Sequence, residues 1–340
     1  MKLKQCVSIF GYLYLTFSLS SCVKDKNLFE EPEITYSEVQ LDLGGECFST
    51  ERPLERAVPN YTRDLLGITV TMLAENDGTT VSKPYAYGIF NVGTTLNDKL
   101  KLNLIDGYQY RISCTMIKRA KDSIMVGNEI QCPLDLERNG KILGTVTDKF
   151  ITAEQPDGQQ KTLYNLESTK IKTGNQDNYT RPFAERYHGV LEKGDIKMGK
   201  TNIIKIYRRF FGVKFKQAGL QAGKLRIEMD GAPAIYLPAA PNPNLGTTET
   251  EAQMVSMKNI TAAIPANSPL TEGVKVTVYL CQEGKQEKII LATSLTFKRN
   301  YMHTIVLTNI DHMGTPGNVS IDIDEEEMKD DYQQDIPWQD

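Results

Sequence analysis

The chain is 340 residues long, is 40% hydrophobic and 24% charged, and carries a formal net charge of -4 at pH 7. Its apolar fraction is sufficient for packed cores, which excludes an intrinsically disordered chain, and its length predicts about two domains at ~150 residues each. A weakly acidic chain lacks the basic surface that binds phosphates, so we expect no nucleic-acid partner.

The N-terminus has the pattern of a secretory signal. Lys2 and Lys4 are followed by a mostly apolar run from Val7 to Leu19, which is shorter than the roughly 20 residues needed to span a bilayer. A basic start, a short apolar core and small residues at its end are typical of a cleaved export signal. We therefore predict a signal peptide over residues 1–21.

The segment Leu19-Ser20-Ser21-Cys22 resembles a bacterial lipobox, in which cleavage falls directly before the cysteine. In proteins with this motif the cysteine is acylated on its sulfur, a good nucleophile, and on its new amine. The resemblance therefore implies lipid attachment at Cys22. The alternative is an ordinary signal peptide in which the cysteine is incidental.

Residues 22–34 are predicted to be a flexible tether. The residues behind Cys22 include Lys24, Asp25 and Lys26, and such a charged stretch cannot join a core. A lysine and an acid at this place also resemble the surface-export signal of lipoproteins in Bacteroidota. We expect the protein to be anchored in the lipid of the outer membrane and exposed at the cell surface.

Short alternating or β-branched segments follow the tether at intervals of roughly ten residues. Strands are predicted at TYSEVQLDL (35–43), LLGITVTML (65–73), AYGIF (86–90), KLKLNL (99–104), YQYRISCTMI (108–117), KILGTVT (141–147) and KTLYNL (161–166). The turn signal Asp106-Gly107 predicts that the fourth and fifth of these form a hairpin. This spacing is typical of an antiparallel sandwich, which we assign to residues 35–197.

A charged stretch rich in Gly and Asn, at residues 173–200, is interpreted as the junction to a second domain. Strands resume at NIIKIYRRFFGVKFKQ (202–217), GKLRIEMD (223–230), AIYLPA (234–239), VKVTVYLCQ (274–282), KIILATSLTFKR (288–299) and YMHTIVLTNI (301–310). We predict that the first of these opens a second sandwich over residues 198–325. Residues 326–340 are predicted to be an acidic C-terminal tail.

The predicted opening strand of the second domain has an aromatic-rich centre. The two-residue period of a strand places Phe211, Val213 and Phe215 on one face. Phe210 and Gly212 then point to the opposite face. The strand is therefore expected to divide its aromatic side chains between two environments.

No arrangement of residues indicates catalysis. The chain has 3 histidines: His188 lies in the predicted junction, His312 in a turn, and His303 in a strand where we expect it to be partly exposed. The motifs of serine hydrolases, zinc proteases and nucleotide-binding loops are absent. We therefore expect no enzyme, no catalytic residues and no cofactor.

Metal binding is not indicated either. Four cysteines remain beyond Cys22 in the processed chain, and their pairing is open among three connectivities. Cys114 lies in an alternating strand and is expected to be a small core residue, and no cysteine spacing is typical of zinc. The acidic run at residues 322–327 lacks the glycine turn of a calcium loop, so we expect no metal.

Four features resemble the fimbrillin-like lipoproteins of Bacteroidota, which are the subunits and accessory proteins of pili. They are the lipobox; YAYGIF followed by KLKLNL and YQYRISCTMI; ERYHGVLEKG leading into IIKIYRRFFGVKF; and LTFKRNYMHTIVLTNID. The resemblance implies an all-β chain of two tandem β-sandwich domains of transthyretin-like type. It also implies a structural, tip or anchor role in a pilus, with other pilus subunits or further copies of the same chain as partners.

The resemblance also implies two ways of processing. Polymerising subunits of this family resemble precursors that an Arg-specific surface protease cuts, whereas anchor proteins keep their lipid. In the loop ERPLERAVPNYTRD, Arg52 is followed by Pro53, which blocks such cutting, so the bond between Arg56 and Ala57 is the better candidate. The alternative is that these are ordinary arginines of a surface loop.

Two segments are candidates for joining subunits, because an added strand gains a full ladder of backbone hydrogen bonds. Cleavage after Arg56 would release TYSEVQLDL. The segment NVSIDID, close to the C-terminus, carries Val319, Ile321 and Ile323 on one face and could fill a groove of a neighbour. The alternative is that both segments pair within their own chain.

A glycan-binding surface lipoprotein of a polysaccharide-uptake system is the alternative function. Sugar sites commonly present exposed aromatic platforms. Here Trp338 lies near the C-terminal end, and Tyr85 and Tyr87 occupy strand positions, where aromatic side chains pack across a sheet. The pilus role is therefore preferred, and a glycan partner stays open.

Overall fold

The computed structural model describes residues 34–46, 64–76, 79–93, 96–118, 120, 125–126, 129–130, 144–152, 166–167, 171–173, 176–181, 183–240, 247–310 and 319–328. The predicted signal peptide with Cys22, and the loop with Arg56 and Ala57, lie outside these residues. In the described part of the chain, no helix is both long enough and apolar enough to cross a membrane.

An eight-stranded sheet forms the first half of the described chain. Its order is β4 (Lys101–Ile105), β1 (Tyr36–Gly45), β13 (Thr201–Arg208), β12 (Arg186–Leu191), β5 (Gln109–Ile117), β2 (Leu65–Asn76), β3 (Thr79–Asn91) and β9 (Ile151–Thr152). The short helix α1 (Leu96–Lys99) precedes β4. This half of the chain also contains two small sheets. One is formed by β6 (Met125–Val126), β7 (Glu129–Ile130) and β8 (Gly144–Thr145), and the other by β10 (Ile171–Thr173) and β11 (Gln176–Tyr179).

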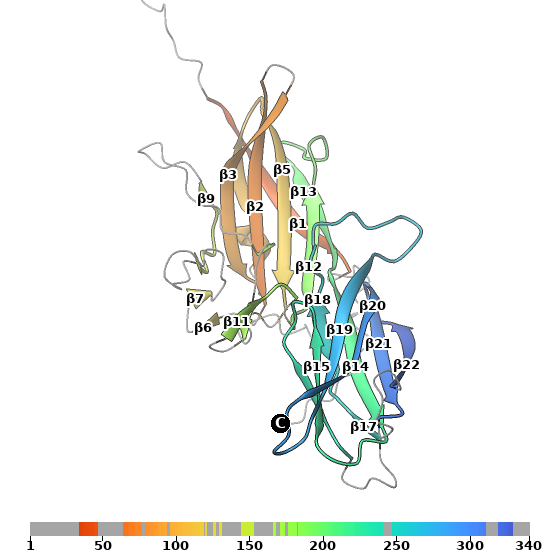
Figure 1. Ribbon diagram of the computed structural model, residues 1–340. Helices are drawn as coiled ribbons and strands as arrows, with labels where there is room; N and C mark the ends of the chain where they lie inside the picture. Colours follow the sequence, from red (N-terminus) through yellow and green to blue (C-terminus); the bar gives the residue numbers. More distant parts are fainter. Residues whose placement is uncertain are drawn as a thin grey trace, which may run out of the picture. The chain divides into compact units, whose positions relative to one another are not determined.

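Two sheets form the second half (Figure 1). The first has the order β17 (Thr247–Glu249), β14 (Phe210–Ala218), β21 (Tyr301–Thr308) and β22 (Ser320–Glu327), with β18 (Gln253–Ser256) also paired to β14. The second has the order β16 (Ile235–Pro238), β15 (Lys224–Met229), β19 (Thr271–Cys281) and β20 (Lys288–Lys298). Side chains of both sheets fill one hydrophobic cluster, so this half is a β-sandwich.

The prediction of an all-β sandwich fold is confirmed. Several strands bury alternate residues, as β13 does with Ile204 and Ile206 in the first core. Cys114 is buried in the same cluster, as expected. Most strand pairs are antiparallel, but β1 pairs with β13, and β14 with β21, in parallel.

The predicted division of the chain at residues 197 and 198 was wrong, because β13 belongs to the first sheet. It pairs with β1 and β12, and the chain passes into the second sandwich only at Phe210.

Phe210 packs in the first core, where its ring lies 5.6 Å from that of Tyr187. Phe211 packs in the second core and stacks on Phe297 at 4.4 Å. Phe210 and Phe211 therefore point to opposite faces, as predicted. The segment predicted as one strand, residues 202–217, is divided into β13 and β14.

The predicted hairpin around Asp106-Gly107 was also wrong. Gly107 does make a turn, with a φ of 84°, but β4 pairs with β1, whereas β5 pairs with β12 and β2. The hydroxyl of Tyr110 donates to the carbonyl of Ile105 (3.1 Å) and accepts from its amide (2.9 Å). These bonds satisfy backbone groups without a β4–β5 ladder.

Two further expectations near the C-terminus are corrected. The predicted tail begins within β22, because Glu326 and Glu327 pair with residues of β21. His303 is fully buried rather than partly exposed. Its Nδ1 lies 3.2 Å from the carbonyl of Gly212, and its Nε2 accepts from the amide of Lys298 at 3.1 Å. These two bonds satisfy both ring nitrogens, which makes the burial of a polar ring tolerable, and burial lowers the pKa of His303.

Glu46, at the end of β1, connects the first sheet to the second sandwich. Its Oε2 accepts from the amide of Arg208 at 2.7 Å, and its two carboxylate oxygens lie 2.8 and 2.9 Å from Nη1 of Arg299. Arg208 is itself buried, and its Nη1 donates to the side chain of Asn300 and to the carbonyl of Met328. The carboxylate of Glu46 therefore accepts hydrogen bonds from residues of both halves of the chain.

We predict that Glu46→Ala lowers the free energy of unfolding by about 2 kcal/mol, because it leaves a half-buried guanidinium and a backbone amide without their acceptor. Urea denaturation followed by circular dichroism measures the change. Glu38→Ala is the matched control, since Glu38 is an exposed residue of the same strand and its removal is expected to change stability by less than about 0.5 kcal/mol. Equal effects of the two variants would contradict the role of Glu46.

Candidate functional site

The predicted donor residues lie on or next to β22, an edge strand. β22 pairs antiparallel with β21 from Tyr301 opposite Glu327 to Thr308 opposite Ser320, and no other described strand pairs with it. Figure 1 shows it at the side of the blue sheet, next to β21. Within the described residues, its second edge therefore has no strand partner, and an edge of this kind can accept another strand.

Few side chains hold β22 to its domain. Val319 and Ile321 are partly buried against the second core, whereas Ile323 is 39% exposed. The rest of the strand is exposed and acidic, with an ion pair between Glu325 and Lys298. The strand depends mainly on its backbone ladder, except at its end, where Met328 is buried in the first core.

The other candidate segment, TYSEVQLDL, is β1, an interior strand. It pairs with β4 on one edge and with β13 on the other, and Val39 and Leu41 are fully buried. Its removal would leave β4 and β13 with unpaired edges and a gap in the first core. The bond between Arg56 and Ala57 lies outside the described residues, as does Cys22.

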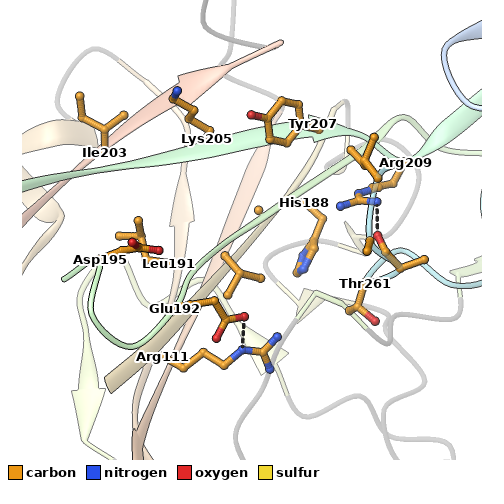
Figure 2. Close-up of a pocket in the computed structure, with 15 residues that line it drawn as sticks. Arg111, His188, Leu191, Glu192, Asp195, Ile203, Lys205, Tyr207, Arg209 and Thr261 are labelled. Carbon is orange, nitrogen blue, oxygen red and sulfur yellow. Dashed lines mark hydrogen bonds and ion pairs between the residues drawn. The ribbon is translucent and has the colours of Figure 1, made fainter. Parts of the chain in front are cut away.

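The structure also contains a pocket of about 650 Å³ that the sequence analysis did not find (Figure 2). Its walls come from Arg111 on β5, from β12 and the turn after it, from the outward side of β13 and from residues 261–264. The sequence contains one indication of this pocket. The two-residue period of β13 places Ile203, Lys205 and Tyr207 on the face opposite the core. Nothing in the sequence placed residues 261–264 opposite this face.

Arg209 is the buried cation of the pocket. Arg209 is 6% exposed, and its Nη1 donates to the carbonyl of Ala262 at 2.7 Å. Among the described residues, its buried Nε has no hydrogen-bond partner. Burial, followed by the charge of Arg299, lowers the pKa of Arg209 to about 10, so it stays protonated at neutral pH. Among the described residues it makes no ion pair.

His188, also in the wall of the pocket, is neutral. It is 1% exposed, and its Nδ1 lies 3.0 Å from the hydroxyl of Thr115. Burial, followed by the charges of Arg209 and Arg111, lowers its pKa to about 4. Glu167 lies 3.7 Å from the same nitrogen, but with this pKa the contact is not an ion pair at neutral pH. Among the described residues, no group of His, Cys, Asp and Glu side chains could hold a metal ion.

No protein-family model matches the chain, and no curated protein matches it. Among solved structures, the fimbrial anchor protein Mfa2 from Porphyromonas gingivalis is similar over 86% of this chain and 98% of that chain, with 11% identity and a TM-score of 0.37.

Two further solved structures are similar over comparable lengths. The tip fimbrial protein Mfa3 from Porphyromonas gingivalis has 8% identity and a TM-score of 0.30, and the match covers 86% of this chain and 100% of that chain. A protein from Bacteroides thetaiotaomicron described as a candidate polysaccharide-binding protein has 10% identity and a TM-score of 0.34, over 87% of this chain and 100% of that chain. Two of these three solved structures are fimbrial proteins.

We predict that His188 makes folding sensitive to acid. Its pKa is about 4 in the folded chain and about 6.5 when unfolded, so the unfolded state binds more protons between these values. The contribution of neutral His188 is complete above pH ~6.5 and is lost as the pH falls toward 4, which amounts to about 2 kcal/mol between pH 7 and pH 5. Urea denaturation at a series of pH values measures this loss.

His188→Gln removes the titrating group and keeps a polar side chain of similar size. The free energy of unfolding of this variant should fall less between pH 7 and pH 5 than that of the natural protein. Because His303 is present in both and its pKa is also lowered by burial, a smaller slope should remain in the variant. Identical slopes would show that His188 is accessible to protons in the folded chain.

Proposed function

We propose that the protein is a non-enzymatic, lipid-anchored surface protein that serves as a structural, tip or anchor component of a pilus. The lipobox ending at Cys22 supports attachment to the outer membrane. The observation that carries the assembly role is β22, an exposed edge strand held mainly by its ladder with β21. Strand exchange between neighbouring subunits through such an edge gives main-chain hydrogen bonds and side-chain pockets together.

Processing distinguishes the roles within a pilus. A protein that keeps the acylated Cys22 acts as an anchor. A protein cut between Arg56 and Ala57 would lose the covalent link to β1, and loss of β1 would open a groove between β4 and β13. In the cut form, this groove would accept the donor strand of a neighbouring subunit. N-terminal sequencing of the protein recovered from the cell surface separates the two forms.

Cys22→Ser is expected to leave an unlipidated precursor and to release the protein from the membrane fraction. Anchoring depends on acyl chains, whose burial contributes ~0.8 kcal/mol per methylene. Cell fractionation and metabolic labelling with palmitate measure the effect. Cys6→Ser is the matched control, because Cys6 lies within the predicted signal peptide and its change should leave labelling intact. Palmitate labelling of the Cys22→Ser protein would exclude the lipobox.

Ile321→Asp is expected to abolish polymers while leaving a folded, surface-displayed monomer, because a charge would enter an apolar pocket. Electron microscopy and sizing of sheared surface material detect polymers, and circular dichroism reports folding. Ser320→Asp is the matched control, since Ser320 is exposed and lies on the opposite face of the same strand, and it should retain most assembly. Polymers that persist in the Ile321→Asp protein would exclude β22 as the donor strand.

Deletion of residues 318–340 tests the same segment in a second way. If the truncated chain is unfolded, the segment belongs to the core of its own domain, as the burial of Met328 would favour. If it is folded but never polymerises, β22 is needed for assembly.

A further inference from the structure

The pocket between β12, β13 and residues 261–264 contains a buried cation, Arg209, that makes no ion pair with a described residue. Arg209 is 6% exposed, and among the described residues its side chain has one hydrogen-bond acceptor, the carbonyl of Ala262. The carboxylate of Glu46 acts favourably on the charge of Arg209, but Glu46 is ion-paired with Arg299. A buried guanidinium without an ion-pair partner of its own is unfavourable. A planar guanidinium can donate two parallel hydrogen bonds to a carboxylate or to a phosphate. The environment of Arg209 therefore favours an anion in the pocket.

The remaining charges of the pocket set the net charge of that anion. Arg111 is paired with Glu192 at 3.2 Å, as Figure 2 shows by a dashed line. Lys205 on β13 and Asp195 in the turn after β12 are both exposed. With His188 neutral, the residues that line the pocket include three cations (Arg111, Lys205 and Arg209) and two carboxylates (Glu192 and Asp195), so the lining carries one surplus positive charge. This surplus fits a ligand with a single negative charge, and the two carboxylates would repel a phosphate dianion.

The other wall residues indicate hydroxyl groups and an apolar face on the ligand. Glu192 and Asp195 can accept hydrogen bonds from hydroxyls, and Tyr207 and Thr261 can donate or accept them. Ile203 is 57% exposed at the pocket and offers a surface to C–H groups. A volume of about 650 Å³ lies within the range of small-molecule sites, which is roughly 300–1,000 Å³, and accommodates one or two sugar rings.

We propose that this pocket binds a carboxylated sugar, such as a uronic acid or a sialic acid residue, with Arg209 holding the carboxylate and the acidic wall holding the hydroxyls. This ligand site goes beyond the role in assembly. It uses β12, β13 and residues 261–264, none of which includes β22. A failure of strand exchange therefore leaves it untouched.

Isothermal titration of the full-length protein in detergent micelles tests the proposal. The probes are digalacturonate and N-acetylneuraminic acid, with lactose as a neutral sugar of similar size and with acetate and inorganic phosphate as plain anions. We expect at least one acidic sugar to bind at least tenfold more tightly than lactose, acetate and phosphate. Binding of phosphate as tight as that of the acidic sugars would overturn the sugar class, and absence of binding by both acidic sugars would overturn the proposal.

Variants place the binding in the pocket. Arg209→Gln should weaken the acidic sugar at least tenfold, and Lys205→Ala, at an exposed position, should weaken it severalfold without affecting folding. Lys275→Ala is the matched control, since Lys275 is an exposed strand lysine of β19 outside the pocket, and it should leave binding unchanged. Circular dichroism checks that each variant is folded. Unchanged binding by both the Arg209→Gln and the Lys205→Ala proteins would exclude this pocket as the site.

Discussion

The architecture depends on one geometric constraint, the alternation of side chains where the chain passes from one sandwich to the other. Phe210 and Phe211 are neighbours in sequence, yet each fills a different hydrophobic core, because successive side chains of an extended chain point in opposite directions. This passage needs no linker. The end of the first sheet is therefore joined directly to the start of the second sandwich. The carboxylate of Glu46 adds a second connection, because it accepts hydrogen bonds from the amide of Arg208 and from Nη1 of Arg299.

The same alternation separates the two arginines that precede this passage. Arg208 points to the interior, where Asn300 and the carbonyl of Met328 accept its hydrogen bonds. Arg209 points to the opposite face and lines a pocket. Two adjacent cations are thus buried in different environments: Nη1 of Arg208 donates to the chain that forms the junction, whereas Arg209 lines the pocket. Both consequences follow from the period of a strand and the desolvation of a charge.

The two proposed functions are located on different parts of the chain and depend on different physical properties. Assembly would use β22, where exposed acidic side chains and a short apolar stretch leave the backbone ladder as the main contribution to pairing. Ligand binding would use the cationic pocket beside β13, where burial strengthens electrostatic interactions. A surface protein can carry both, because neither uses the side chains of the other.

The sequence by itself determined the leader pattern, the strand-rich class, the core position of Cys114 and the opposite directions of Phe210 and Phe211, because each depends on local composition or on the two-residue period. It did not determine that β4 and β5 have different partners, that β13 belongs to the first sheet, or that His303 is buried, because periodicity states which face a residue occupies and not which strand lies beside it. The pocket around Arg209 required the tertiary structure for the same reason: residues 261–264 and β13 are far apart in the chain, and only folding brings the carbonyl of Ala262 within 2.7 Å of the guanidinium.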